Sequence, residues 1–358
     1  MSRIVVSGYY GSKNAGDEAM LAAMIEVLSE LDPKLYITVI SADPEDTRQR
    51  HGVEAIPWLS VGAIWSAVRK ADLLISGGGS LLQNVTSGRS LYYYLSVILL
   101  ARLAGTPVML YAQGIGPVCG GFARWLMTAI SRRVARITVR DYGSLEELRS
   151  LNITRPPSEV TADPVLAIHP VDRGIGRAIL TKYKAAGAKP VVGISVREWR
   201  GWSGYKKAIA AAAGEIAREF EARVIFLPMQ YPEDVETARK IAAQAGEPMI
   251  VLDEEYTTSE LLSIVGNLDL LISIRLHGLI FAGVMGVPMV GISYDPKIDR
   301  FLDSIDEKPA ADLKTATVEN IMAAVREKWA NRKNEAEQRE GRLAELRRLA
   351  ARNAELAL

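Results

Sequence analysis

The chain has 358 residues, 49% of them hydrophobic and 24% charged, which is typical of a globular protein long enough for two domains. Its 43 basic and 42 acidic residues leave a net charge of +1, so no overall positive field would attract nucleic acid, and we expect no nucleic-acid partner. The single cysteine, Cys119, excludes an internal disulfide framework and a zinc site built from cysteines.

The N-terminus and the apolar segments bear on location. The first residues lack the long apolar region and the small-residue cleavage site of a signal peptide. No stretch reaches the roughly 18–20 apolar residues that a membrane span needs. The longest candidate, residues 91–104, contains three tyrosines and Arg102, and we predict a buried helix there. These features predict a cytoplasmic protein.

Short β-branched runs alternate with helical patterns along the chain, which predicts βα units and parallel sheets. The predicted strands of the first half are residues 4–7, 36–40, 73–76, 108–112 and 137–139. The first helix is predicted to begin near Asp17, because apolar residues at helical spacing follow it. Asp17 and Glu18 suit a helix N-terminus as cap and dipole partner.

A second set of elements follows the proline-rich segment 155–158. Its predicted strands are residues 191–196, 224–228, 249–251, 270–274 and 289–293, with helices such as 205–220 and 234–245 between them. We therefore predict two doubly wound, Rossmann-like α/β domains facing a cleft. Their predicted bounds are 1–168 and 169–318.

Residues 319–358 form a third, helical segment, rich in Ala, Glu, Arg and Leu. Three interpretations are open for it. The segment is a solvated surface helix, or it packs back across the first domain, or its arginines contact acidic membrane lipid, although intermixed acids weaken that last case.

The most informative motif is Arg275-Leu276-His277-Gly278, directly after the strand predicted at 270–274. Ligands of open α/β sheets bind outside the carboxyl ends of the strands. Arginine offers a planar set of donors to a carboxylate or phosphate, and histidine can move a proton near neutral pH. The motif therefore indicates an anion site beside a proton carrier. A helix cap with a satisfied histidine is the structural alternative.

Two further cations stand near strand ends in the second domain. Arg197 follows the strand at 191–196, and Lys297 closes the run Gly291-Ile-Ser-Tyr-Asp-Pro-Lys297 after the next strand beyond His277. Trp199 and Trp202 lie close to Arg197 in the sequence and could cover the face of a sugar ring; a role in the core is the alternative. Each cation is a candidate for binding an anionic substrate.

Glycine-rich motifs mark the strand ends of the first domain. The segment 8–18 matches neither the dinucleotide-binding fingerprint nor a P-loop, and its carboxylates would oppose a phosphate, so we interpret it as a loop that accepts hydrogen bonds from sugar hydroxyls. The segment 77–83 exposes backbone N–H groups at a predicted helix start. A glycine turn with a cap is the alternative for each motif. The candidate binding residues here are Asn14, Asp17, Glu18, Gly78, Gly79, Ser80, Gln83, Gln113 and Arg140.

Together these motifs resemble the polysaccharide pyruvyl transferases, most closely the CsaB type that modifies bacterial cell-wall polymer precursors. The motifs that carry the resemblance are Gly8-Tyr-Tyr-Gly-x-x-Asn-x-Gly-Asp-Glu18, Gly77-Gly-Gly-Ser-Leu-Leu-Gln83, Gln113-Gly-Ile-Gly-Pro117, Arg140-Asp141, Arg275-Leu-His-Gly278 and Gly291-Ile-Ser-Tyr-Asp-Pro-Lys297. The resemblance implies a fold similar to two-domain glycosyltransferases of the GT-B type. It also implies phosphoenolpyruvate as donor and a cyclic pyruvate ketal on a sugar as product.

CsaB-type enzymes act on N-acetylmannosamine in a lipid-linked precursor, and the finished ketal helps to anchor surface-layer proteins. By this resemblance we expect His277 to be catalytic and phosphoenolpyruvate to contact Arg275, Leu276, Lys297 and Arg197. Trp199 joins the first-domain candidates on the acceptor side. We expect no metal and no cofactor besides phosphoenolpyruvate as co-substrate. The implied partners are phosphoenolpyruvate, the lipid-linked sugar and, peripherally, the inner membrane face.

Two other functions remain open from the residues alone. A nucleotide-sugar glycosyltransferase of the GT-B type would share the cleft and could bind a diphosphate with Arg275 and Lys297. A non-catalytic module that senses a sugar or an anion is the second alternative.

Overall fold

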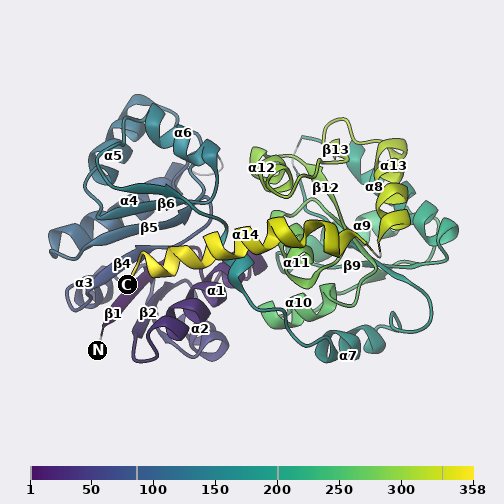
Figure 1. Cartoon of the computed structure of the whole chain (residues 1–358), viewed down its shortest axis with the longest axis horizontal. Coiled ribbons are helices and arrows are strands. Elements are labelled where there is room, and N and C mark those ends of the chain that lie inside the picture. The colour runs from purple at the N-terminus through teal and green to yellow at the C-terminus, as the bar shows by residue number, and fades with distance from the viewer. Residues whose placement is uncertain (1, 86–87, 200, 333) are drawn as a thin grey trace. The chain divides into compact units, whose positions relative to one another are not determined.

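The computed structural model describes residues 2–85, 88–199, 201–332 and 334–358 (Figure 1). The chain divides into two compact units. Unit 1 comprises Met1–Ile168 with Leu346–Leu358, and unit 2 comprises His169–Glu345. None of the helices in the described part of the chain is long and apolar enough to cross a bilayer.

Unit 1 contains a seven-stranded parallel sheet in the order β3-β2-β1-β4-β5-β6-β7. Its strands are β1 (Arg3–Ser7), β2 (Tyr36–Ser41), β3 (Glu54–Pro57), β4 (Leu73–Ser76), β5 (Val108–Gln113), β6 (Arg136–Val139) and β7 (Ser158–Val160). Its helices are α1 (Ala15–Leu31), α2 (Pro44–His51), α3 (Val61–Val68), α4 (Gly88–Leu103), α5 (Gly121–Ser131), α6 (Tyr142–Ser150) and the short 3₁₀ helix η1 (Pro164–Ala167). The order of strands reverses between β1 and β4.

Two apolar layers cover the sheet of unit 1. One consists of side chains from α3, α4, α5 and α6 packed against the central strands. The other combines α1 with the last residues of the chain, including Ala354, which is fully buried. Strands buried on both faces read as continuous apolar runs, and this is why β4 and β5 were recognisable in the sequence.

Unit 2 contains a six-stranded parallel sheet in the order β10-β9-β8-β11-β12-β13, which reverses between β8 and β11. Its strands are β8 (Val191–Ser195), β9 (Arg223–Phe226), β10 (Ile250–Val251), β11 (Leu270–Ser273), β12 (Met289–Ser293) and β13 (Ala311–Asp312). Its helices are α7 (Gly174–Lys182), α8 (Gly204–Glu219), α9 (Glu233–Ala242), α10 (Thr258–Val265), α11 (Leu276–Met285), α12 (Pro296–Ser304) and α13 (Val318–Asn331).

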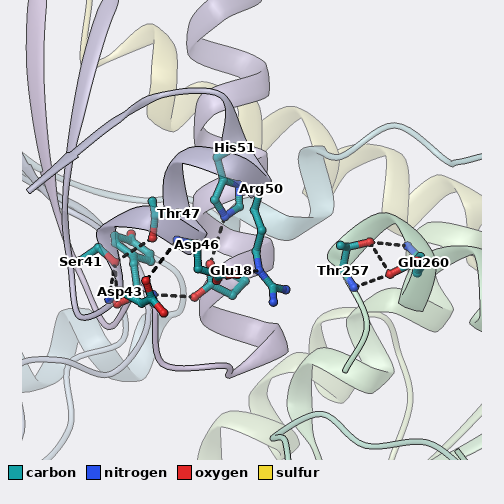
Figure 2. Close-up of polar contacts among 11 residues, drawn as sticks. Glu18, Ser41, Asp43, Asp46, Thr47, Arg50, His51, Thr257 and Glu260 are labelled. Carbon is teal, nitrogen blue, oxygen red and sulfur yellow. Dashed lines mark hydrogen bonds and ion pairs between the residues drawn. The ribbon is translucent and has the colours of Figure 1, made fainter. Parts of the chain in front are cut away.

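Local signals in the sequence define several helix starts. In α10, the Thr257 side chain accepts from the backbone N–H of Glu260, and the Glu260 carboxylate accepts from the Thr257 N–H at 2.7 Å, which forms a capping box (Figure 2). In α1, the cap is Asn14, whose side chain accepts from the N–H groups of Gly16 and Asp17. The prediction of Asp17 as cap is therefore wrong, because the helix begins two residues earlier and Asp17 lies in its first turn.

Every predicted strand is present, with ends that differ by no more than two residues. The sequence analysis missed β3, β7 and β13, which are short strands at or next to a sheet edge and carry little apolar signal. The predicted helix start at residues 77–79 is also wrong, because α4 begins only at Gly88. Gly79 instead pairs with Gln113 in an isolated β-bridge, and its carbonyl accepts from the Gly114 N–H at 2.8 Å.

Residues 319–358, which the sequence analysis set apart, are distributed over both units. Helix α13 packs on α8 in unit 2. Helix α14 (Glu335–Glu355) belongs to unit 2 up to Glu345, and from Leu346 the chain belongs to unit 1. There Asn353 is fully buried and its Oδ1 accepts from the Thr161 hydroxyl at 2.8 Å. This contact supports the interpretation that the end of the segment packs on the first domain.

Candidate active site

The predicted cations of unit 2 all follow strands that are neighbours in the sheet. Arg197 comes after β8, Arg275 after β11, and Lys297 after β12, and these three strands are adjacent in that order. The strand order reverses between β8 and β11, which is where open α/β sheets bind their ligands. The topology therefore brings the three residues to one edge of the sheet.

Arg275 is held by a buried carboxylate that the sequence analysis did not single out. Its Nε donates to Asp234 Oδ2 at 3.0 Å, and its Nη2 donates to Asp234 Oδ1. Asp234 is only 1% exposed, and its Oδ2 also accepts from the backbone N–H groups of Met229 and Gln230. This bidentate ion pair fixes the plane of the guanidinium and uses the donors Nε and Nη2 along one of its edges.

Arg197 lies between two aromatic rings. Its guanidinium carbon is 5.1 Å from the centre of the Trp199 ring and 4.7 Å from that of the Tyr294 ring, and its Nη1 donates to the Tyr294 hydroxyl. Trp199 packs on Tyr294 with ring centres 4.7 Å apart and stacks on Trp202 at 5.6 Å. The structure thus places Trp199 among the predicted donor-side cations of unit 2.

We name Arg197, Arg275 and Lys297 the cation cluster. The pKa of Tyr294 reflects the combined charge of these three residues. The Lys297 Nζ lies 5.6 Å from the Tyr294 ring centre and 3.8 Å from an oxygen of Asp295. Burial by itself would raise the pKa of Tyr294. The positive charges of Lys297, Arg197 and Arg275 outweigh that effect, so the pKa of Tyr294 is lowered from its ordinary value.

His277 and Leu276 occupy the first turn of α11, next to this cluster in the chain. Leu276 is buried, so we expect it to meet a ligand through its backbone, while His277 is half-buried. No side chain in the described part of the chain caps this helix, whose N-cap residue is Arg275. A helix N-terminus attracts anions through its N–H groups and its dipole. The arrangement therefore favours a negatively charged ligand.

Gly278 lies in the first turn of α11, against the end of β11. A Cβ at this position would lie 2.6 Å from the Ser273 hydroxyl oxygen. That hydroxyl donates to the Arg275 carbonyl at 2.7 Å and accepts from the Arg275 N–H at 3.0 Å. Glycine at this place therefore lets Ser273 orient the backbone that carries Arg275.

In unit 1, the glycine motifs meet at the carboxyl edge of the sheet. The Gln113 side-chain amide donates to the carbonyls of Ser76 and Gly77 at 3.0 and 2.7 Å. A Cβ at Gly116 would lie 2.8 Å from the Cβ of Gln83, so the motifs after β4 and β5 are in direct contact. Gly79 lies close to Asp17, since a Cβ there would be 3.3 Å from Asp17 Oδ1.

Arg140 joins these motifs through a buried ion pair. Its Nη1 donates to Asp163 at 2.9 Å and its Nη2 to the Ser80 hydroxyl at 3.0 Å. Both charged side chains are about nine-tenths buried or more. Gly114 leaves room for this guanidinium, because a Cβ there would meet it at 2.7 Å. Arg140 therefore links the strand ends of β4 and β6, and Gly78 packs beside them on Met20.

Glu18 contacts His51 and the loop after β1. Its Oε2 lies 3.0 Å from His51 Nε2, and its Oε1 accepts from the Gly11 N–H at 2.8 Å (Figure 2). Gly11 has a φ of 71°, and a Cβ there would meet Ser41 at 2.3 Å. Glu18 thus positions the loop after β1, and Asp17 is the carboxylate that lies near Gly79.

A depression of about 500 Å³ lies elsewhere in unit 1. Tyr36 and Glu54 line it, and these are the first residues of β2 and β3. It therefore opens at the amino edge of the sheet, opposite the motifs described above. Carboxyl ends are where ligands of such sheets bind, so we do not regard this depression as the active site.

Three residues of these sites escaped the sequence analysis: Asp163, Asp234 and Tyr294. Asp234 stands among Glu233 and Glu236 at the start of a helix, where acids are common for reasons of dipole alone. Tyr294 was inside a quoted motif, but nothing in a linear sequence says that its ring lies against Arg197. Only the pairing of strands distant in sequence shows these contacts.

Comparisons with solved structures identify the fold. The chain is similar to S. aureus MnaA in a co-structure with UDP, at 13% identity and a TM-score of 0.69, over 99% of this chain and 94% of that chain. It is similar to the UDP-GlcNAc 2-epimerase from Neisseria meningitidis bound to UDP-GlcNAc, at 12% identity and a TM-score of 0.66, over 99% of both chains.

The third comparison is with E. coli ADP-heptose lipopolysaccharide heptosyltransferase II, at 14% identity and a TM-score of 0.55, over 93% of this chain and 100% of that chain. At such identities the likeness shows the fold alone: two Rossmann-like domains of the GT-B type with a C-terminal helix, as the sequence analysis predicted.

None of the curated proteins compared with the chain matches it. The family model described as polysaccharide pyruvyl transferase matches residues 14–296, which include Asn14, the glycine motifs after β4 and β5, Arg275, His277 and Tyr294. The match covers well over half of the chain, from the cap of α1 to the first residue of α12. The chain therefore belongs to the polysaccharide pyruvyl transferase family.

Proposed function

We propose that this enzyme transfers the pyruvate group of phosphoenolpyruvate to a sugar, forming a cyclic ketal and releasing phosphate. The observation that carries the proposal is the cation cluster around Tyr294 at the ends of β8, β11 and β12. Phosphoenolpyruvate presents a carboxylate and a phosphate, and a charge-assisted hydrogen bond to such a group contributes roughly 1.5–3 kcal/mol. Three cations and the N-terminus of α11 match those two anionic groups.

The reaction needs one proton at carbon and the loss of two from hydroxyls. Protonation of the methylene carbon of phosphoenolpyruvate makes the central carbon electrophilic, and a sugar hydroxyl adds there while losing its proton. A second hydroxyl then forms the second C–O bond as the C–O bond to phosphate breaks, and its proton leaves with the phosphate. His277, at the start of α11, is our candidate for delivering or receiving one of these protons.

Unit 1 offers the acceptor side in this proposal. Asp17 lies close to Gly79, and a carboxylate accepts hydrogen bonds from sugar hydroxyls. The same negative charge would repel a trianionic donor. We propose N-acetylmannosamine of a lipid-linked cell-wall polymer precursor as the acceptor, which follows from the resemblance to the CsaB type.

The test measures phosphate release from phosphoenolpyruvate with and without a lipid-linked N-acetylmannosamine acceptor, with mass spectrometry of the product. We expect release only with acceptor, and a product heavier by one pyruvate ketal. A chelator is expected to leave the rate unchanged, because the proposed steps use side chains alone. Transfer of sugar from a nucleotide-sugar, with no release from phosphoenolpyruvate, would instead identify a glycosyltransferase.

A further inference from the structure

Two neighbouring helices of unit 1 expose large apolar side chains to solvent. On α4, Tyr92, Leu99 and Leu103 lie at a spacing that places them on one face. All three are exposed, Leu103 to 68%. On α5, which packs beside α4 (Figure 1), Phe122 and Trp125 are 65% and 63% exposed. Most large apolar side chains of unit 1 are buried, and those on α4 and α5 stand out because three of them are aromatic rings in mutual contact.

Three of these side chains are continuous across the two helices, and Leu99 and Leu103 extend the same face along α4. The ring centres of Tyr92 and Phe122 are 6.2 Å apart, and those of Phe122 and Trp125 are 5.9 Å apart with the rings nearly parallel. We name the five residues Tyr92, Leu99, Leu103, Phe122 and Trp125 the aromatic face. A contiguous exposed apolar patch marks a site of interaction with a protein or a membrane.

The chain segment that carries the aromatic face is basic. Residues 73–140, which contain α4 and α5, include seven arginines and no Asp, Glu or Lys, although the whole chain is nearly neutral. Arg89 at the start of α4 and Arg132 and Arg133 directly after α5 are exposed. Arg124 of α5 lies 3.9 Å from Glu147 of α6 and is partly neutralised by it. The arginines that accompany the aromatic face as exposed charges are therefore Arg89, Arg132 and Arg133 at the helix ends.

We propose that the aromatic face and these arginines bind the surface of an anionic lipid bilayer. Aromatic and aliphatic side chains enter the boundary between headgroups and acyl chains, while arginines contact lipid phosphates. A second copy of this chain fits less well, because a twofold interface would bring the same arginines of both copies together.

The surface connects directly to the motif that we assign to the acceptor. The Asn84 side chain donates to the Cys119 carbonyl and accepts from the Cys119 N–H, each at 2.7 Å. Asn84 follows Gln83 of the glycine motif, and Cys119 precedes α5. Bilayer binding at α4 and α5 would thus bring the acceptor motif close to a lipid-linked sugar; this second step rests on the proposed function.

Sedimentation of the full chain with vesicles tests the surface without any assay of activity. We expect binding to vesicles of phosphatidylglycerol and phosphatidylcholine, weaker binding to phosphatidylcholine alone, and loss of binding at high salt. The double variant Phe122→Ser, Trp125→Ser should reduce partitioning roughly tenfold or more. Arg132→Gln with Arg133→Gln should have a similar effect on anionic vesicles.

Matched controls lie on unit 2. Ile175→Ser removes an exposed apolar side chain of α7, and Lys207→Gln with Lys240→Gln removes two exposed cations. Both should bind vesicles as the parent does. The proposal is overturned if the parent does not bind anionic vesicles, or if the Phe122 and Trp125 variant binds them as tightly as the parent. It is also overturned if the aromatic face instead mediates dimer formation in solution.

Transfer to a soluble, lipid-free acceptor separates the two proposals. The Phe122 and Trp125 variant should keep this activity, because neither side chain belongs to the proposed site. Vesicle binding without any pyruvyl transfer would contradict the proposed function and leave the bilayer surface standing. Transfer to the soluble acceptor without vesicle binding would contradict only the bilayer surface.

Discussion

Tyr294 is the residue through which the cation cluster can be measured. Its ring is half-buried, and loss of hydration favours the neutral form, yet the surrounding cations lower its pKa below the ordinary value. The folded state therefore releases this proton at a lower pH than the unfolded state. Tyr294 contributes stability that is fully present above its unfolded pKa, about 10, and is lost as pH falls through the lowered folded pKa.

Ligand binding should change that ionisation. We predict that phosphoenolpyruvate raises the pKa of Tyr294, because a trianion beside the phenol disfavours its negative form. Ultraviolet absorbance of tyrosinate during a pH titration measures the change, and Tyr294→Phe removes the earliest ionising tyrosine from the curve. An unchanged titration of the parent under saturating phosphoenolpyruvate would place the donor away from the cation cluster.

Asp234 should be essential for the stability of unit 2. Asp234→Ala leaves Arg275 without its buried partner, and breaking one side of such a pair costs about 3–5 kcal/mol. Glu247→Ala is the control, because Glu247 pairs with Arg218 at 3.2 Å on the exposed surface, where a pair contributes roughly 0–1 kcal/mol. Urea unfolding of both variants measures the difference. Equal losses would mean that the Asp234 pair is not the anchor of Arg275.

His277 is expected to act in chemistry more than in binding. The His277→Gln enzyme should bind phosphoenolpyruvate within a few-fold of the parent and lower kcat by about 10²–10⁴, the range for a lost general acid or base. Isothermal calorimetry and single-turnover kinetics separate the two quantities. A folded variant with parental kcat would show that His277 is not a catalytic acid or base and is only a structural residue in the first turn of α11.

At the scale of elements, the end of α14 is part of the core of unit 1. Asn353 accepts from Thr161, and its amide donates to the carbonyls of Ala162 and Ala350. It is fully buried beside Ala354, which packs in the layer that contains α1. A helix that begins in unit 2 thereby supplies part of the apolar cover of the other sheet.

Because Asn353 is buried in this packing, we predict that truncating its side chain lowers the stability of unit 1. Asn353→Ala should remove the side-chain donor to the buried Ala162 carbonyl and leave the Thr161 hydroxyl with only the Val139 carbonyl as acceptor, which costs about 1–3 kcal/mol. Thermal unfolding measures the loss. Arg348→Ala, on the same helix and without a buried contact of this kind in the described residues, should change stability little. A neutral Asn353→Ala would mean that the C-terminal residues do not anchor unit 1.

At the scale of the whole molecule, the two units differ in the charge at their strand ends. In unit 2, Asp234 pairs with Arg275 and Asp295 lies 3.8 Å from Lys297, yet these two cations and Arg197 together still lower the pKa of Tyr294. In unit 1, Arg140 is neutralised by Asp163, and Asp17 lies near Gly79. We therefore propose that the anionic donor binds unit 2 and the hydroxyl-rich acceptor binds unit 1.

This division of labour predicts opposite kinetic effects. Lys297→Ala should raise KM for phosphoenolpyruvate and leave KM for the acceptor nearly unchanged, because it removes a donor-side charge. Asp17→Asn should raise KM for the acceptor alone; Asn14, not Asp17, caps α1, so the fold should persist. Steady-state kinetics with each substrate varied in turn measures both. A Lys297→Ala enzyme impaired only toward the acceptor would reverse the assignment.

Local patterns were sufficient for the framework of the fold. Continuous apolar runs marked the buried strands, and glycines, cations and His277 after those runs marked the strand ends. The edge strands β3, β7 and β13 escaped because they bury little apolar surface. The helix start expected at 77–79 failed because Gly79 pairs with Gln113, a contact between residues far apart in sequence.

The sequence by itself determined the family, the two α/β domains and the order of the motifs, since these depend on residue types and spacings along the chain. Only the tertiary structure decided which partners the charged side chains have. Asp234 accepts hydrogen bonds from Arg275, Tyr294 lies among the residues of the cation cluster, and Glu18 pairs with His51. The physical reason is that a charge takes its partner from whatever the packing of distant strands and helices brings within hydrogen-bonding distance, and linear spacing does not encode that distance.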